Sequence, residues 1–88
     1  MISARQIRAA RALIGLSQPE LAERAGVGVA TIRRIEAALD QITGNARTLD
    51  RIQSALEAAG VHFIESHGTL GEGVRLDKSP ALPSTKRR

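Results

Sequence analysis

The sequence has no cysteine, tryptophan or tyrosine, and its only aromatic residue is Phe63. Without cysteine there can be neither a disulfide framework nor a thiolate zinc site, so stability has to come from packing. A core without aromatic bulk must be built from Leu, Ile, Val and Ala, which suits closely packed helices. The missing cysteines also fit a reducing cytoplasm, so we expect a cytoplasmic protein.

Long apolar runs are missing as well. Arg5, Arg8 and Arg11 interrupt the apolar positions of the N-terminus, and nowhere do about 18 apolar residues follow one another. We therefore expect a protein that is neither exported nor inserted in a membrane. Its 88 residues leave room for one small domain, so an extended catalytic cleft between domains is not expected.

Charge of one sign is only modestly in excess. Thirteen basic and nine acidic residues give a formal charge of +4, which allows a polyanionic partner without requiring one. Part of the excess lies at 86–88, at the end of a segment with Pro80 and Pro83 that lacks apolar periodicity. We expect residues 77–88 to form a disordered basic tail.

Capping signals divide the first part of the chain into two helices. Ser3 is a candidate N-cap, and apolar residues recur at helical spacing from there to Gly15. Ser17 and Glu20 have the spacing of a capping box, and Gly26 is placed to end the second helix. A third helix is predicted over Val29–Glu36 after a three-residue turn.

The second part of the chain predicts one more helix and a hairpin. An apolar stripe from Leu49 to Ala59, closed by Gly60, indicates the fourth helix. Residues 61–64 and 74–76 indicate two short strands joined by a Gly-rich loop. The predicted fold is all-α, with four helices over residues 1–60 and a short C-terminal β-hairpin over 61–76. An isolated hairpin is marginal in water, so it should pack on the fourth helix or form a dimer contact with a second subunit.

The second and third helices form the most informative pair. Both are short, a tight turn containing Gly joins them, and Leu21, Ile32 and Ile35 can share one core. Such a pair is how a helix-turn-helix motif is built. Ala22 is small enough to let the two helices cross at short range.

Around this pair the sequence reads Leu16-Ser17-Gln18-Pro19-Glu20-Leu21-Ala22, then Gly26-Val27, then Thr31-Ile32-Arg33-Arg34-Ile35-Glu36. This pattern resembles the XRE-type, lambda repressor-like helix-turn-helix family, over roughly Ile2 to Val61. The resemblance implies a lambda repressor-like fold and a sequence-specific DNA-binding transcriptional regulator, most simply a repressor, of bacterial or phage origin. Double-stranded DNA is the implied partner.

The resemblance also implies which residues touch DNA. Gln18 would bind a phosphate beside the N-terminus of the second helix. The start of the third helix would reach base edges through outward positions, namely Gly28, Val29, Ala30, Arg33 and Arg34. Arg34 is the strongest donor for a guanine, whereas Val29 and Ala30 offer only apolar contact to a thymine methyl. The alternative is that Arg33 and Arg34 touch phosphates alone.

Five further residues have implied roles outside base reading. Thr31, Asn45 and Arg47 resemble positions that hold the DNA backbone, although Asn45 could equally cap the fourth helix. Relatives pair an Arg with a Glu at the positions of Arg11 and Glu36, which implies a structural ion pair fastening the first helix to the third.

Neither metal nor catalytic chemistry is indicated. His62 and His67 have no obvious third ligand, and no Ser has a His and an acid arranged to activate it. The glycines of 68–73 are not followed by the Lys-Ser/Thr of a phosphate loop. We expect no metal, no cofactor and no enzymatic activity.

One short recognition helix reads few base pairs, so a homodimer on two half-sites about one helical turn apart is expected. The nearest alternative function is an antitoxin that regulates itself through the same motif and binds a toxin. A module whose third helix binds protein instead of DNA is a rival of another class. A protein partner therefore stays open at this point.

Overall fold

The computed structural model describes residues 1–38 and 45–79. The described chain forms four helices followed by two strands: α1 (Ala4–Ile14), α2 (Gln18–Ala25), α3 (Val29–Glu36), α4 (Ala46–Ala58), β1 (Val61–Ile64) and β2 (Gly73–Leu76). Four helices with a C-terminal hairpin are the predicted fold, and this prediction is confirmed.

Local side-chain chemistry sets the ends of the first two helices. The Ser3 hydroxyl oxygen accepts from the Gln6 N–H, and the Gln6 side-chain oxygen accepts from the Ser3 N–H, which together form a capping box. Ser17 and Glu20 form the same arrangement at the start of α2. Gly15 and Gly26 end these helices with φ of 67° and 71°, a left-handed conformation that residues with a Cβ rarely adopt. The turn into α3 therefore begins at a defined point.

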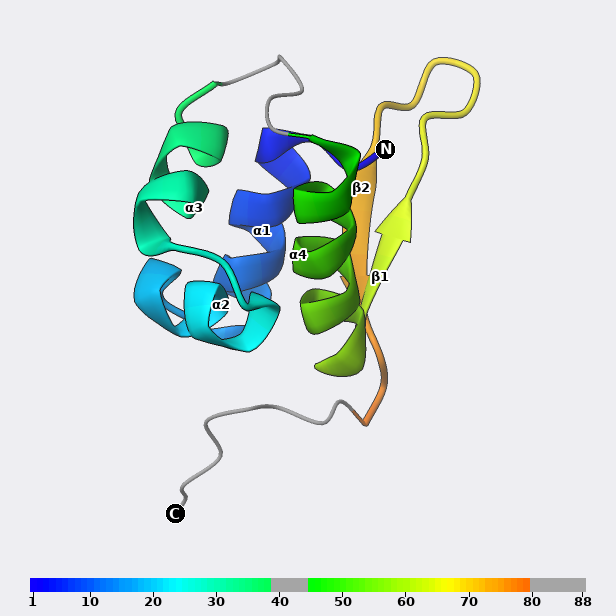
Figure 1. Ribbon diagram of the computed structural model, residues 1–88. Coiled ribbons are helices and arrows are strands. Elements are labelled where there is room, and N and C mark those ends of the chain that lie inside the picture. Colours follow the sequence, from blue (N-terminus) through cyan, green and yellow to red (C-terminus); the bar gives the residue numbers. More distant parts are fainter. Residues whose placement is uncertain (39–44, 80–88) are drawn as a thin grey trace.

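The core lies between the four helices and the inner face of the hairpin (Figure 1). Its largest fully buried side chains are Ile7, Leu21, Ile32, Ile35, Leu49, Ile52, Leu56 and Val61. Ala10 and Ala22 are also buried, and such small residues let neighbouring helix backbones approach closely. The helices thus pack without aromatic residues, and Phe63 only borders the core.

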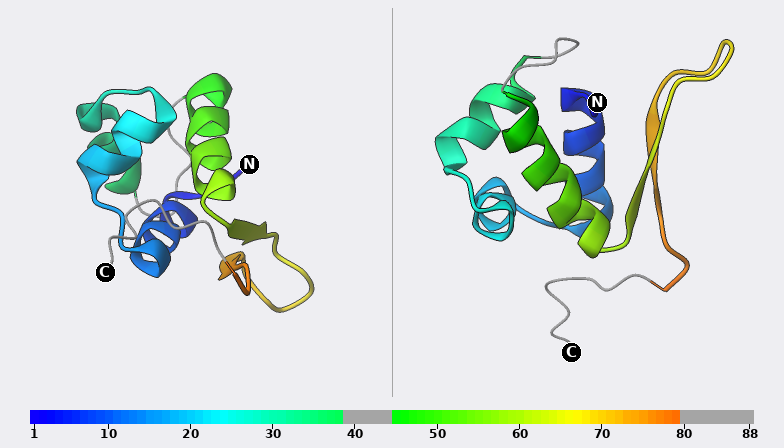
Figure 2. Two further views of the ribbon diagram at one scale, coloured as in Figure 1. Left: turned by 90° about the horizontal axis from the view of Figure 1, so that it is seen from below. Right: turned by 45° about the vertical axis from the view of Figure 1, so that its right-hand side comes forward.

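The hairpin covers the side of α1 and α4 that faces away from α3 (Figures 1 and 2). β1 and β2 are antiparallel, with Val61 opposite Leu76 and Ile64 opposite Gly73. β2 contacts α1 and β1 contacts α4, so the hairpin packs on two helices and not on the fourth helix alone. The helical layer therefore separates the hairpin from α3.

The Gly-rich loop predicted between the strands contains a tight turn. His67 and Leu70 exchange two backbone hydrogen bonds of 2.8 and 3.0 Å, and Gly68 between them has φ of 61°. A positive φ at this position is typical of the tight turns that join two strands. The connection is thus a closed turn at the tip of a projecting arm.

The boundary between hairpin and tail also needs correction. The Asp77 N–H donates to the Gly60 carbonyl oxygen at 2.8 Å, and the Asp77 carboxylate contacts Nε2 of His62. Asp77 therefore belongs to the hairpin and not to the tail that was predicted to begin there. Lys78 and Ser79 are exposed, and residues 80–88 of the predicted tail lie outside the described residues.

Candidate DNA interface

The turn between α2 and α3 is fixed from two sides. The Val27 N–H donates to the Ala22 carbonyl oxygen at 3.0 Å, and the Val27 side chain packs against the core. From α4, Nη1 of Arg51 donates to the Gly26 carbonyl oxygen at 3.3 Å. These contacts hold α3 at a set angle to α2. Arg51 was not among the predicted site residues, although its spacing of four from Arg47 places both on one face of α4.

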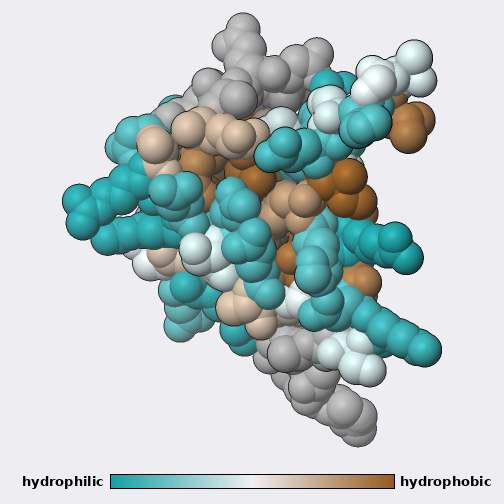
Figure 3. Space-filling view, turned by 90° about the vertical axis from the view of Figure 1, so that its right-hand side faces the viewer, coloured by the Kyte–Doolittle hydropathy of each residue, from teal (hydrophilic) through white to brown (hydrophobic). Residues whose placement is uncertain are grey.

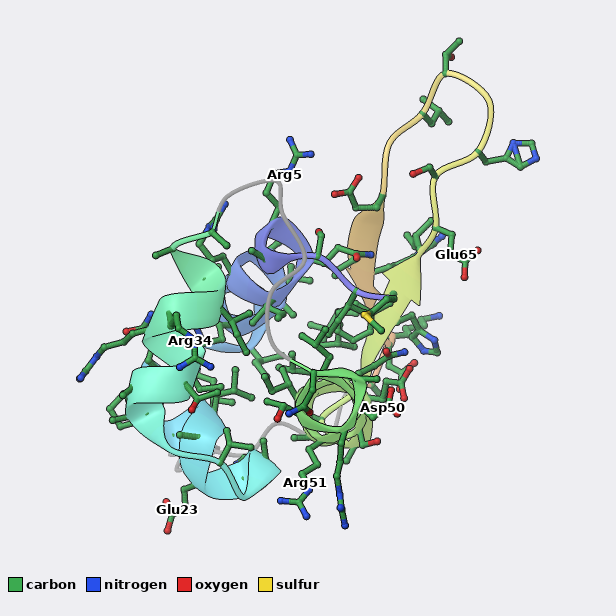
Figure 4. The ribbon with its side chains drawn as sticks, turned by 45° about the horizontal axis from the view of Figure 1, so that its top comes forward. Arg5, Glu23, Arg34, Asp50, Arg51 and Glu65 are labelled. Carbon is green, nitrogen blue, oxygen red and sulfur yellow. The ribbon has the colours of Figure 1, made fainter. Side chains whose placement is uncertain are left out.

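The outward face of α3 is basic. Ala30, Arg33 and Arg34 are exposed, while Ile32 and Ile35 are buried behind them. Neither arginine has an ion-pair or hydrogen-bond partner in the part of the chain that the structure describes. Figure 4 shows the Arg34 side chain projecting from α3, with none of the labelled carboxylates beside it. Both guanidinium groups are thus available to an external anion.

Val29 was predicted to point outward from α3, and this prediction is wrong. It is half-buried and packs against the core instead of pointing outward. The reason is helical spacing, because Val29 is one turn before Ile32 and so shares its inward stripe. Of the two residues expected to make apolar contact with DNA, Ala30 alone is exposed, and Thr31 is half-buried.

The N-terminus of α3 has no side-chain cap. Gly28 occupies the N-cap position, and its carbonyl oxygen accepts from the N–H groups of Thr31 and Ile32. The N–H groups of Val29 and Ala30 have no backbone acceptor among the described residues. The positive end of the helix dipole is thus open at the point where Gly28 was predicted to approach DNA.

A buried carboxylate joins the three helices around this face. Nε and Nη2 of Arg11 each lie 2.7 Å from a carboxylate oxygen of Glu36, whose side chain is 4% exposed. Nη1 of Arg11 also donates to the Leu16 carbonyl oxygen at 3.0 Å. The hydrogen bond to Glu36 raises the pKa of Arg11, outweighing the opposite effect of burial. The ion pair implied by the resemblance is present in this geometry.

Gln18 belongs to the same network. Its Nε2 donates to Oε1 of Glu36 at 3.0 Å, which fixes the orientation of the amide at the start of α2. One amide N–H is used in this bond, so the phosphate contact implied by the resemblance would have to use the other. Arg8 adds a bond to the Glu36 backbone carbonyl oxygen. Arg8 lies three residues before Arg11, so the sequence already indicated that both arginines share one face of α1.

Asn45 and Arg47 lie at the start of α4. Oδ1 of Asn45 accepts from the Thr48 N–H at 2.8 Å, so the capping role, one of the two that were weighed, is the one the structure contains. Arg47 is exposed in the first turn and lines a shallow hollow between α2 and α4 with Arg24 and Arg51. Three arginines from α2 and α4 therefore gather at this hollow, together with Asp50.

Two other kinds of site are absent from the described residues. No group of three His, Cys, Asp or Glu side chains within 1–38 and 45–79 is placed to hold a metal ion. Within the same ranges, no helix is both long and apolar enough to cross a bilayer.

Comparison with known proteins agrees with this geometry. A family model described as helix-turn-helix matches residues 7–63, from within α1 to within β1, and so covers well over half of the chain. A search of curated proteins found no match. The matched region contains the whole α2–α3 unit, the Arg11–Glu36 pair and the basic surface. The chain therefore belongs to the XRE-type, lambda repressor-like helix-turn-helix family of DNA-binding regulators.

Proposed function

We propose that this protein is a sequence-specific transcriptional repressor that binds double-stranded DNA as a homodimer and inserts α3 into the major groove. The observation that carries the proposal is the face of α3, where Arg33 and Arg34 are exposed and unpaired among the described residues. A surface arginine without a carboxylate partner, on a helix of a DNA-binding family, is suited to meet phosphates or base edges.

Within that face the residues have different tasks. Arg34 would hold guanine O6 and N7 in a bidentate contact, and Ala30 would touch a thymine methyl. Arg33 would meet a phosphate, as would Arg47 from the start of α4. Gln18 would bind a phosphate with the N–H that Glu36 leaves unused. Base choice then rests mainly on Arg34.

The dimer follows from the small number of bases that one short helix can read. Two copies of α3 on half-sites about one helical turn apart would supply the specificity that one lacks. Such a repressor would act in the cytoplasm of a bacterium, where its operator is accessible. We place that operator upstream of the protein's own coding region, the simplest site for autoregulation.

The test is an anisotropy titration of the full chain with labelled duplexes tiled over that upstream region, at two salt concentrations and with excess competitor DNA. The variants are Arg34→Ala and, as matched control, Arg75→Ala, which removes an exposed arginine of β2 on the side away from α3. Loss of one bidentate base contact, about 1–3 kcal/mol, should weaken binding to one tile by about 10-fold to 100-fold.

The Arg75→Ala variant should bind that tile like the unmodified protein. Equal binding to every tile, unchanged in Arg34→Ala, would overturn base reading by α3. A toxin-like protein that co-purifies with the chain and changes its DNA binding would identify an antitoxin instead of a plain repressor.

A further inference from the structure

The outer edge of β1 has unused backbone hydrogen-bonding groups. The bond from the Asp77 N–H to the Gly60 carbonyl oxygen sets the alternation of the antiparallel ladder. It follows that His62 and Ile64 direct their N–H and C=O groups toward β2, whereas Val61 and Phe63 direct theirs away from it. Neither of those two outward N–H groups has a backbone acceptor among residues 1–38 and 45–79.

This edge also lacks the usual protection. Natural edge strands carry Lys, Pro or a bulge that hinders pairing with another chain. β1 reads Val-His-Phe-Ile and has none of these, whereas β2 has Arg75 near its middle. The backbone of β1 is thus the more open of the two edges to a further strand.

Apolar side chains gather at the same place. In the described part of the chain the exposed large apolar residues are Met1, Leu13, Ile64 and Leu70. Ile64 and Leu70 belong to the hairpin, and Met1 lies beside it. Met1 and Phe63 line one hollow between α1, α4 and the hairpin. Figure 3 faces the hairpin side and shows apolar surface open between polar side chains. A partner on this side would cover both the edge and the apolar groups.

We propose that the partner is a second copy of this chain, which pairs its β1 antiparallel with the first to form a four-stranded sheet. Centred on Phe63, the pairing joins the outward groups of the two Phe63 residues to each other, and those of Val61 to Glu65 of the other copy. It places His62 of each copy opposite Ile64 of the other, so no two like charges are opposed. A register centred on His62 would instead oppose the two imidazoles and leave Ile64 opposite Gly60.

The direction of the resulting symmetry axis suits DNA binding. A two-fold axis between paired edges runs perpendicular to the sheet, and α3 lies beyond α1 and α4 along that same direction (Figures 1 and 2). Both copies of α3 therefore point to one side, as two half-sites of one duplex require. Only this step of the proposal rests on the proposed function. The open edge and its apolar neighbours do not depend on it.

The first experiment measures the oligomeric state of the full chain without DNA, by sedimentation velocity over a range of concentrations. Ile64→Lys is compared with Leu13→Lys, because both side chains are 44% exposed but Leu13 belongs to α1 and not to the edge strand β1. The unmodified protein and Leu13→Lys should be dimers with equal dissociation constants, and Ile64→Lys should raise that constant at least 10-fold. A monomeric unmodified protein, or equal effects of the two lysines, would overturn the proposal.

The second experiment tests the register by oxidative crosslinking, for which the natural absence of cysteine is an advantage. In the variant with both His62→Cys and Ile64→Cys, the opposed pairs should have Cα atoms about 4.5 Å apart, within disulfide range. This variant should form a covalent dimer, and each single variant should not. A covalent dimer from His62→Cys alone, or no covalent dimer from the pair, would overturn the register.

Both readouts are made without DNA, so they separate the two proposals. Crosslinked dimers that fail to bind any duplex would leave the strand pairing intact and overturn the proposed function. If the unmodified protein binds its operator and Ile64→Lys remains a dimer, the proposed function stands and the strand pairing is overturned.

Discussion

The two ends of α1 are held by different kinds of contact. At its C-terminal end Arg11 makes two bonds of 2.7 Å to the buried carboxylate of Glu36, and the amide of Gln18 binds the same group. At its N-terminal end the neutral amide of Gln6, 5% exposed, donates to the carbonyl oxygens of Ile64 and Gly73 at 3.1 and 2.9 Å. We name these the charged clamp and the neutral clamp.

The difference teaches how the fold divides its tasks. The charged clamp fixes α1, α2 and α3 relative to one another, and so sets the geometry of the basic face. The neutral clamp fastens the hairpin to the helices without placing any ionised group in the core. A buried ion pair loses far more when one partner is removed than a neutral hydrogen bond does. The proposed DNA-reading unit should therefore tolerate change less well than the hairpin attachment.

The largest expected effect comes from breaking the charged clamp. Arg11→Met leaves the Glu36 carboxylate buried with Gln18 as its one side-chain partner among the described residues, and should lower the free energy of unfolding by about 3–5 kcal/mol. Adding Glu36→Met should restore part of this loss, because no buried charge then remains. Urea denaturation of both single variants and the double variant measures the coupling. A coupling energy near zero would show that the two residues act independently.

A smaller effect is expected from breaking the neutral clamp. Gln6→Ala removes two hydrogen bonds, but the carbonyl oxygens of Ile64 and Gly73 keep their bonds within the hairpin, so the loss should be about 1–3 kcal/mol. Hydrogen exchange should accelerate at hairpin amides and stay unchanged in α2 and α3. Gln53→Ala is the control, since among the described residues that amide bonds to Glu57 one turn along α4 and not to the hairpin. Equal acceleration throughout the chain would show that the hairpin is not a separate unit.

The smallest effect concerns Glu72, which directly precedes β2 and accepts a hydrogen bond from Ser3 beside the start of α1. Its own backbone N–H and the Ser3 hydroxyl, at 3.0 Å, together with Arg5, lower the pKa of Glu72. A pKa that is lower in the folded than in the unfolded state stabilises the fold at neutral pH. That contribution is lost as the pH falls through the folded-state pKa. The stability of the unmodified protein relative to Glu72→Gln should therefore decrease on acidification, and a constant difference would contradict the assignment.

Local signals made most of the helical part predictable. Ser17, Glu20 and Gly26 act on backbone groups within a few residues of themselves, so their pattern alone predicts where α2 begins and ends. The bounds of α3, which has no side-chain cap, followed from the helical spacing after the three-residue turn. The Arg11–Glu36 pair lies 25 residues apart and came only from the family resemblance.

Contacts between distant segments account for what the sequence did not reveal. Gln6 meets carbonyl groups 58 and 67 residues away, and no local pattern indicates that a hairpin will lie there. Arg51 reaches the turn at Gly26 across 25 residues. Val29 is different, because its spacing from Ile32 already indicated an inward position. The outward position predicted for Val29 came from the family resemblance and not from this spacing.

The place where the chain leaves the hairpin has a practical consequence. Asp77 is pinned to Gly60 and His62 at the base of the hairpin, on the side away from α3. Any peptide joined beyond this point starts its path with the helical layer between it and the basic surface. A fluorophore, an affinity tag or a tether to a sensor chip attached there should leave the duplex-facing side accessible, whereas labels on α2 or α3 would obstruct it.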